Sequence, residues 1–231
     1  PALAAAAREG VVLPVFIWDP ESEQPWAPGS ASRAWLHHSL TRLSEALETL
    51  GTPLVIRRGD SLGELQRLVQ ETGATAVFWN RRYEPLVIAR DAEIKQTLKN
   101  EGIRSTSFPG NLLLEPWEIE NQSGDPFQVF TPFWKKHLAL YGHSSPAGAP
   151  ARLSTLPNRD RPESLNVGDL ELLPEPRWDR GFYERFEPGE AGAREALELF
   201  CDDGAIESYR SQRNRPDLRQ TSRLSPHLAF G

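Results

Sequence analysis

The stretch VVLPVFIW, residues 11–18, decides the fold class, because a helical pattern and further short apolar runs follow it. An apolar run of this length between polar segments is typical of a buried strand. In the helical pattern, leucines recur at spacings of three and four, which places them on one face of a helix. These leucines are Leu36, Leu40, Leu43, Leu47 and Leu50, and Gly51 follows them.

The same alternation continues along the first half of the chain. Further strands are predicted at residues 53–57, 76–80 and 103–108, with one helix capped by Ser61 and another from about Leu86 to Asn100. Repeated strand–helix–strand units require parallel pairing with right-handed crossovers, so we expect an α/β fold with an open, doubly wound parallel sheet. No G-x-G-x-x-G motif follows a strand, which disfavours a nicotinamide-dinucleotide site.

Beyond residue 110 the pattern changes twice. Prolines recur with little periodicity up to residue 180, which is typical of an extended connector. Within it, residues 129–141 carry aromatic side chains at helical spacing, and we expect a short helix packed on the α/β domain. From Pro188 a helical pattern restarts, with Ala193, Ala196, Leu197 and Phe200 predicted to face inward. The predicted domains are residues 1–125 (α/β), 126–180 (linker with a short helix) and 181–231 (start of an all-helical domain).

Composition narrows the class of protein. The chain has 231 residues, a net charge of −6 and one cysteine, Cys201, so an internal disulfide framework and a clustered thiolate metal site are excluded. No apolar run approaches the roughly 20 residues of a membrane span. We expect a monomeric cytoplasmic protein without a metal or membrane partner. Methionine is absent and both ends fall inside structural patterns, so we expect a fragment truncated at both ends.

The last 23 residues, YRSQRNRPDLRQTSRLSPHLAFG, differ from the acidic remainder. Five arginines face only Asp217, and guanidinium forks match phosphate oxygens. The hydroxyls of Thr221, Ser222 and Ser225 follow, and they suit either a helix cap or a phosphate cradle. Taken alone, the three hydroxyls favour the cap. A basic strip followed by a phosphate cradle would suit two anions, a nucleic-acid backbone and a cofactor pyrophosphate.

Several landmarks now combine. TSRLSPHLAFG, preceded by YRSQR and WDRGFYERFEPGEAGAREALELF, resembles the photolyase/cryptochrome family, and VFTPFWK and WNRRYEP are further landmarks in the expected order. The resemblance covers nearly the whole chain and is to a class I type cyclobutane pyrimidine dimer photolyase. It implies an antenna-type doubly wound domain, a long linker and the start of an all-helical FAD-binding domain.

The resemblance also implies roles for individual residues. The positions matching the family's FAD site are Tyr209, Thr221, Ser222, Arg223, Leu224 and Ser225. Arg213 matches a DNA-contacting arginine, and a contact to phosphate would bind DNA of any sequence. No side chain is assigned a catalytic role, because the redox chemistry belongs to the cofactor. Where folate-using members carry Asn-Glu this chain has Leu86-Val87, so a folate, a deazaflavin, a second flavin or no antenna all remain open.

The activity that the resemblance implies is that of a deoxyribodipyrimidine photo-lyase, a carbon–carbon lyase. Light-driven electron transfer from reduced FAD would split cyclobutane pyrimidine dimers in DNA, the expected partner. The alternatives are a cryptochrome-type blue-light photoreceptor and a catalytically inactive binding module. We expect the 231-residue chain itself to be inactive and to purify without colour.

Overall fold

The computed structural model describes residues 1–142, 148–202, 204–218 and 221–230. The chain divides into two compact units, each built from two stretches of sequence. The first unit holds residues 1–12 and 74–153, and the second holds residues 13–73 and 154–231. Each unit is described separately. The domain boundaries expected from the sequence stay a prediction.

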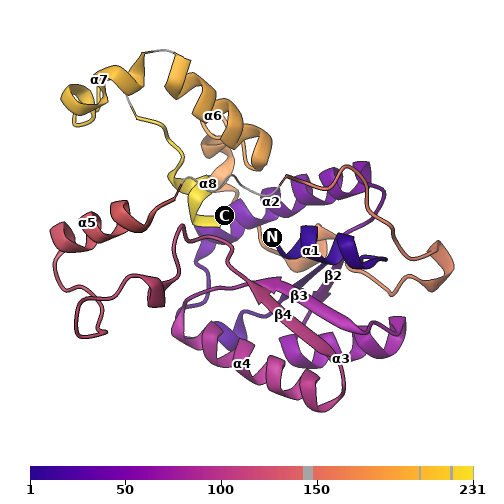
Figure 1. The fold of residues 1–231 in the computed structure, drawn as a ribbon. Helices are drawn as coiled ribbons and strands as arrows, with labels where there is room; N and C mark the ends of the chain where they lie inside the picture. Colours follow the sequence, from indigo (N-terminus) through magenta and orange to yellow (C-terminus); the bar gives the residue numbers. More distant parts are fainter. Residues whose placement is uncertain (143–147, 203, 219–220, 231) are drawn as a thin grey trace. The chain divides into compact units, whose positions relative to one another are not determined.

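The first unit is built around one parallel strand pair. Strands β3 (Ala76–Asn80) and β4 (Arg104–Phe108) pair in register from Ala76 opposite Arg104 to Asn80 opposite Phe108. Helix α1 (Ala2–Glu9) lies against β3, and helix α4 (Pro85–Asn100) connects the strands and lies against β4 (Figure 1). The buried side chains of α4 recur on one face, because they are Val87, Ile94 and Leu98.

The second unit contains the other strand pair. Strands β1 (Val15–Trp18) and β2 (Val55–Arg58) are parallel, and helices α2 (Ser30–Thr49) and α3 (Ser61–Thr72) follow them in the chain. Helix α3 is capped by Asp60, whose carboxylate accepts a hydrogen bond of 2.7 Å from the amide of Gly63, so the prediction of Ser61 as the cap was wrong by one residue. Gly73 ends the helix with a φ of 68°.

The α/β class with parallel strands is therefore confirmed. Among the described residues, the strands form two two-stranded sheets, β1–β2 and β3–β4. The leucine face predicted for α2 is partly covered: Leu40 and Leu47 are buried, whereas Leu43 is 45% exposed. Its buried positions also include Trp35, which the leucine pattern had not singled out.

The proline-rich connector is more ordered than its sequence suggests. It contains short 3-10 turns, including η4 (Val167–Leu170) and η5 (Trp178–Phe182). In the second unit, the amide of Ile56 donates to the Ser164 hydroxyl at 2.9 Å, and the amide of Leu165 donates to the carbonyl of Ile56 at 2.9 Å. The connector also contributes buried residues to this unit; they are Leu170, Leu172 and Asp179.

The remaining helices expose much apolar surface. Helix α5 (Phe130–Leu140) forms where the sequence predicted it, but none of its residues is buried, so its expected packing on the α/β domain is not observed. Helices α6 (Glu190–Asp202), α7 (Ala205–Gln212) and α8 (Ser225–Phe230) follow. In α6 the predicted inward face is incomplete, since Leu197 is 48% exposed. No helix within the described ranges is both long and apolar enough to cross a bilayer.

Candidate functional site

Helix α7 presents Tyr209 and Arg213 together, as their spacing of four residues predicts. The Arg213 guanidinium lies over the Tyr209 ring, 5.8 Å from its centroid. Tyr209 also packs against Phe200 of α6 in a T-shaped arrangement, with ring centroids 5.8 Å apart and an interplanar angle of 86°. Arg213 is exposed and has no ion pair among the described residues. Its charge is therefore available to an external anion.

The neighbouring arginines differ in their pairing. Arg215 forms a fork with Asp217 through hydrogen bonds of 2.9 and 2.6 Å. These bonds lower the pKa of Asp217 and raise that of Arg215. Arg219, one of the five arginines in the last 23 residues, lies outside the described residues. Besides Arg213, the exposed arginines of this segment that form no ion pair with a described residue are Arg210 and Arg223.

The hydroxyl-rich turn does not cap the helix that follows it. The carbonyl of Leu224 accepts the first helical hydrogen bond from Leu228 at 2.9 Å, so Leu224 occupies the cap position of α8. The hydroxyls of Thr221, Ser222 and Ser225 form no hydrogen bond with any described residue. The cap hypothesis therefore has no support in the observed hydrogen bonds.

The backbone of the same turn adopts an uncommon conformation at Arg223. Its φ is 53°, one of two positive values at described residues other than glycine. A residue with a β-carbon pays about 1–2 kcal/mol to enter this left-handed region. Such conformations concentrate where the backbone must present groups to a ligand. The turn thus combines a strained backbone with hydroxyl groups that form no hydrogen bond within the described part of the chain.

At the carboxyl end of β3, shortly before Leu86-Val87, the polar side chains already form hydrogen bonds with one another. The Glu115 carboxylate accepts hydrogen bonds from the Arg81 guanidinium at 2.7 and 3.2 Å and from the Tyr83 hydroxyl at 3.0 Å. Burial is the main cause that raises the pKa of Tyr83, and its hydrogen bond to Glu115 is the second. The hydrogen bond to Glu115 also raises the pKa of Arg81. Asn80 accepts a hydrogen bond from the amide of Ala2 at 3.1 Å. These contacts fix the loop and leave few groups for a chromophore.

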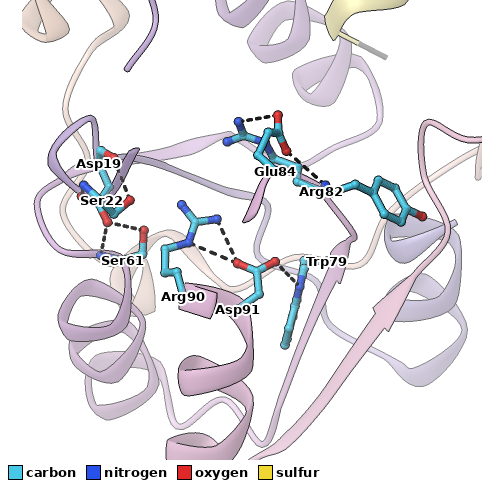
Figure 2. A network of polar contacts seen from close by, with 9 residues as sticks. Asp19, Ser22, Ser61, Trp79, Arg82, Glu84, Arg90 and Asp91 are labelled. Atoms are coloured by element: carbon cyan, nitrogen blue, oxygen red, sulfur yellow. Dashed lines mark hydrogen bonds and ion pairs between the residues drawn. The ribbon is translucent and has the colours of Figure 1, made fainter. Parts of the chain in front are cut away.

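Figure 2 shows further polar contacts, around Asp19 in the second unit and around Asp91 and Glu84 in the first. In the second unit, buried Asp19 accepts from the Ser61 amide at 2.9 Å and the Ser61 hydroxyl at 2.7 Å, which joins the end of β1 to the start of α3. Burial opposes ionisation of Asp19, but these hydrogen bonds lower its pKa overall. In the first unit, Asp91 accepts from the Trp79 indole at 3.0 Å and from Arg90 at 2.9 Å.

Two cavities lie away from the predicted site residues. One of about 540 Å³ belongs to the first unit, where Glu120, Phe127 and Lys136 line it. The other, of about 450 Å³, is lined by His37 and Glu171 in the second unit. No group of three or more potential metal ligands occurs in the described part of the chain. The predicted residues thus lie in two segments outside both cavities, Tyr209 and Arg213 on α7 and residues 221–225 in the turn before α8.

Sequence reasoning missed one contact to this region. Trp35 on α2 touches His227 and Phe230 of α8, the helix directly after the hydroxyl-rich turn. Trp35 lies outside the leucine series, although it is apolar and one position before Leu36. The signal that could have found it is the presence of a large aromatic residue at the margin of an apolar helix face.

Comparison with known proteins decides the family. The DNA photolyase family matches residues 1–151. This chain belongs to that family. It is 42% identical to a deoxyribodipyrimidine photo-lyase from Agrobacterium fabrum, over 99% of the chain and 47% of that protein. It is also 38% identical to cryptochrome-1 of Arabidopsis thaliana, over 100% of the chain and 34% of that protein.

The solved structures agree. A crystal structure of a bacterial class III photolyase from Agrobacterium tumefaciens matches with a TM-score of 0.88 and 41% identity, over 99% of this chain and 46% of that one. The chain therefore spans about half the length or less of the relatives it matches. The α/β fold and the family expected from the sequence are both confirmed.

Proposed function

We propose that this chain is part of a deoxyribodipyrimidine photo-lyase that repairs cyclobutane pyrimidine dimers in DNA with light and FAD. The observation that carries the proposal is the turn of residues 221–225. Its three hydroxyls form no hydrogen bond with a described residue, and it contains the exposed Arg223, in a member of the DNA photolyase family. The Agrobacterium fabrum relative, 42% identical, is a deoxyribodipyrimidine photo-lyase and supports the same activity here.

The donor groups of the turn fit a pyrophosphate. Hydroxyl, guanidinium and backbone N–H groups are the donors that bind phosphate oxygens, and a charged group leaving water needs several of them. Thr221, Ser222 and Ser225 would donate hydroxyl hydrogen bonds, and Arg223 would neutralise charge. Tyr209, which contacts both Phe200 and Arg213, would provide an aromatic surface beside the cofactor. Leu224 would contribute an apolar contact.

The cofactor and the chain's own residues would have different roles. When bound, reduced FAD supplies the light-driven electron transfer that splits the dimer and takes the electron back. The chain's own residues bind and orient. Arg213, exposed and without an ion pair among the described residues, would contact a DNA phosphate. Flipping a dimer lesion out of the duplex costs less free energy than flipping an intact base, because the stacking of the lesion is already weakened.

We propose a class III type enzyme in place of the class I type expected from the sequence. The support is the Agrobacterium tumefaciens structure, which is 41% identical and is described as a class III photolyase.

A cyclobutane dimer as the lesion, a monomeric state and the antenna chromophore stay predictions. The one cysteine, Cys201, is free and exposed, which fits the proposed reducing, cytoplasmic compartment.

A cryptochrome-type photoreceptor is the second candidate, because the chain is 38% identical to Arabidopsis cryptochrome-1 over its whole length. Both candidates would bind FAD, so cofactor binding does not separate them. The FAD-bound protein is illuminated with duplex DNA that contains cyclobutane dimers. Loss of dimers supports the photolyase, whereas unchanged dimers together with light-dependent binding of a protein partner would support the photoreceptor.

The cofactor site is tested by substitution. Thr221→Ala, Ser222→Ala and Ser225→Ala are combined in the FAD-bound protein, and the dissociation constant of FAD is measured by flavin fluorescence on dilution. We expect FAD binding at least about 1,000-fold weaker, since three hydrogen bonds to a charged phosphate at about 1.5–3 kcal/mol each sum to about 4.5 kcal/mol or more. Ser32→Ala and Thr131→Ala, two exposed hydroxyls elsewhere, serve as controls. Unchanged affinity in the triple variant contradicts the proposed site.

A further inference from the structure

The turn of residues 221–225 leads directly into α8, so the contacts that α8 makes also bear on the position of the turn. α8 begins at Ser225, the last hydroxyl residue of that turn. Its surface is largely exposed, and Leu228 is 72% exposed. The placement of the turn therefore depends on whatever side chains hold α8 in place.

Those contacts converge on one buried residue, Trp35 of α2. The Trp35 ring meets His227 edge-on at a centroid distance of 5.2 Å and lies 6.5 Å from Phe230. His227 and Phe230 are three residues apart, so they project from the same face of α8. A third ring, Phe186, packs edge-on against Trp35 at 6.4 Å. All four residues belong to the second unit, and Trp35 itself is 8% exposed.

The contact joins two parts of the chain that are nearly 200 residues apart in sequence. Trp35 is fixed by the α/β framework, since it stands on a 20-residue helix whose Ala34, Leu40 and Leu47 are also buried. His227 follows Ser225 by two residues. A displacement of the His227 ring would therefore move the last hydroxyl of the turn by a comparable distance.

We propose that Trp35 is a positioning residue for flavin binding: it anchors α8 and thereby sets the geometry of the turn that holds the pyrophosphate. This proposal rests on the proposed function of the turn. Trp35 does not touch the cofactor. Its effect is indirect, because a phosphate site needs its donors within hydrogen-bond reach at the same time, and a turn that moves with a loose helix would not keep them there.

The experiment compares three variants of the FAD-bound protein with a matched control. Trp35→Ala removes the anchor, Trp35→Phe keeps a ring, and His227→Ala removes the partner on α8. Leu47→Ala is the control, because Leu47 is 3% exposed on the same helix and lies 12 residues after Trp35. For each protein we measure the FAD dissociation constant, the thermal midpoint of the apoprotein and hydrogen exchange in the peptide covering residues 221–230.

We expect Trp35→Ala and His227→Ala to weaken FAD binding about tenfold, the equivalent of losing one or two aromatic contacts, and to accelerate exchange in the peptide. Trp35→Phe recovers most of the affinity. Leu47→Ala lowers the thermal midpoint but leaves FAD affinity within about twofold, because distant sites act independently. If Leu47→Ala weakens FAD as much as Trp35→Ala does, Trp35 acts only through general stability and the inference is wrong.

His227→Ala gives an independent test if Trp35→Ala does not fold, since His227 is only half-buried. Unchanged FAD affinity in His227→Ala would contradict the proposal that Trp35 positions the turn through α8. The two proposals can fail separately. If the triple variant of Thr221, Ser222 and Ser225 loses FAD while the Trp35 and His227 variants keep it, the flavin site at the turn is supported and the positioning role of Trp35 is contradicted. If the triple variant keeps FAD, the proposed function of the turn itself fails.

Discussion

Removing the negative charge of Asp179 tests how strongly burial controls the stability of this fold. Asp179 is completely buried in the connector, and the Arg177 guanidinium grips both of its oxygens at 2.8 and 2.9 Å. These hydrogen bonds lower the pKa of Asp179, so its carboxylate is stabilised in the folded state. The perturbation is Asp179→Asn, which keeps the shape of the side chain and removes the charge.

The expected magnitude follows from the lost interactions. Asn can accept only one of the two bonds, and a hydrogen bond to a charged group contributes about 1.5–3 kcal/mol. Arg177 is 29% exposed, so water can still reach the cation that remains, and the full penalty of an unpaired buried charge does not apply. We expect a loss of about 2 kcal/mol, which for a protein of this size lowers the thermal midpoint by about 4–8 °C.

The chain offers a matched control for this experiment. Arg215 and Asp217 form the same fork at the same spacing, but their side chains are 60% and 57% exposed. Exposed pairs of this kind contribute little, so Asp217→Asn should leave the thermal midpoint unchanged. The assay is thermal unfolding followed by circular dichroism. An equal shift in the two variants would refute the reasoning, because the local geometry is shared and only burial differs.

Three more predictions concern pH and packing. Burial, together with nearby positive charge, lowers the pKa of His37 and His38 below 6.5. The folded state therefore binds fewer protons than the unfolded chain, and the free energy of unfolding should fall as the pH drops below about 6.5. At the alkaline end, burial raises the pKa of Tyr183 to about 12, so stability should fall as the pH rises from 10 towards 12; urea titrations across pH check both limits. Leu98→Ala, at a fully buried position, should cost about 2–5 kcal/mol in urea unfolding, whereas Trp134→Ala on exposed α5 should cost far less, and equal losses would contradict the assigned burial.

The sequence predicted the regular elements better than the packing between them. Apolar runs and glycine stops located β3, α4 and β4 to within one or two residues, because these signals are local. The connector was misjudged, since Leu170, Leu172 and Asp179 are buried in 3-10 turns and extended backbone that produce no periodic pattern. A spacing of three and four identifies a helix face but cannot say whether another element covers it.

Within the candidate site, the sequence predicted the pairing of Tyr209 with Arg213 because four residues make one helical turn. It could not choose between a cap and a cradle for the hydroxyls, because Ser and Thr serve both purposes. That choice needs the hydrogen bonds themselves. Nor could it find the contact between Trp35 and α8, since no local pattern encodes a contact between such distant positions.

The two sites suggested by the family resemblance differ in hydrogen-bonding state. At the carboxyl end of β3, Glu115 satisfies Arg81 and Tyr83, so a ligand there would have to break existing bonds. At residues 221–225 the hydroxyls have no partner in the described part of the chain, and Arg223 holds a costly backbone conformation. Strain and free donors persist where binding compensates for them. By this argument the turn before α8 is the better candidate for ligand binding, and the β3 loop is structural.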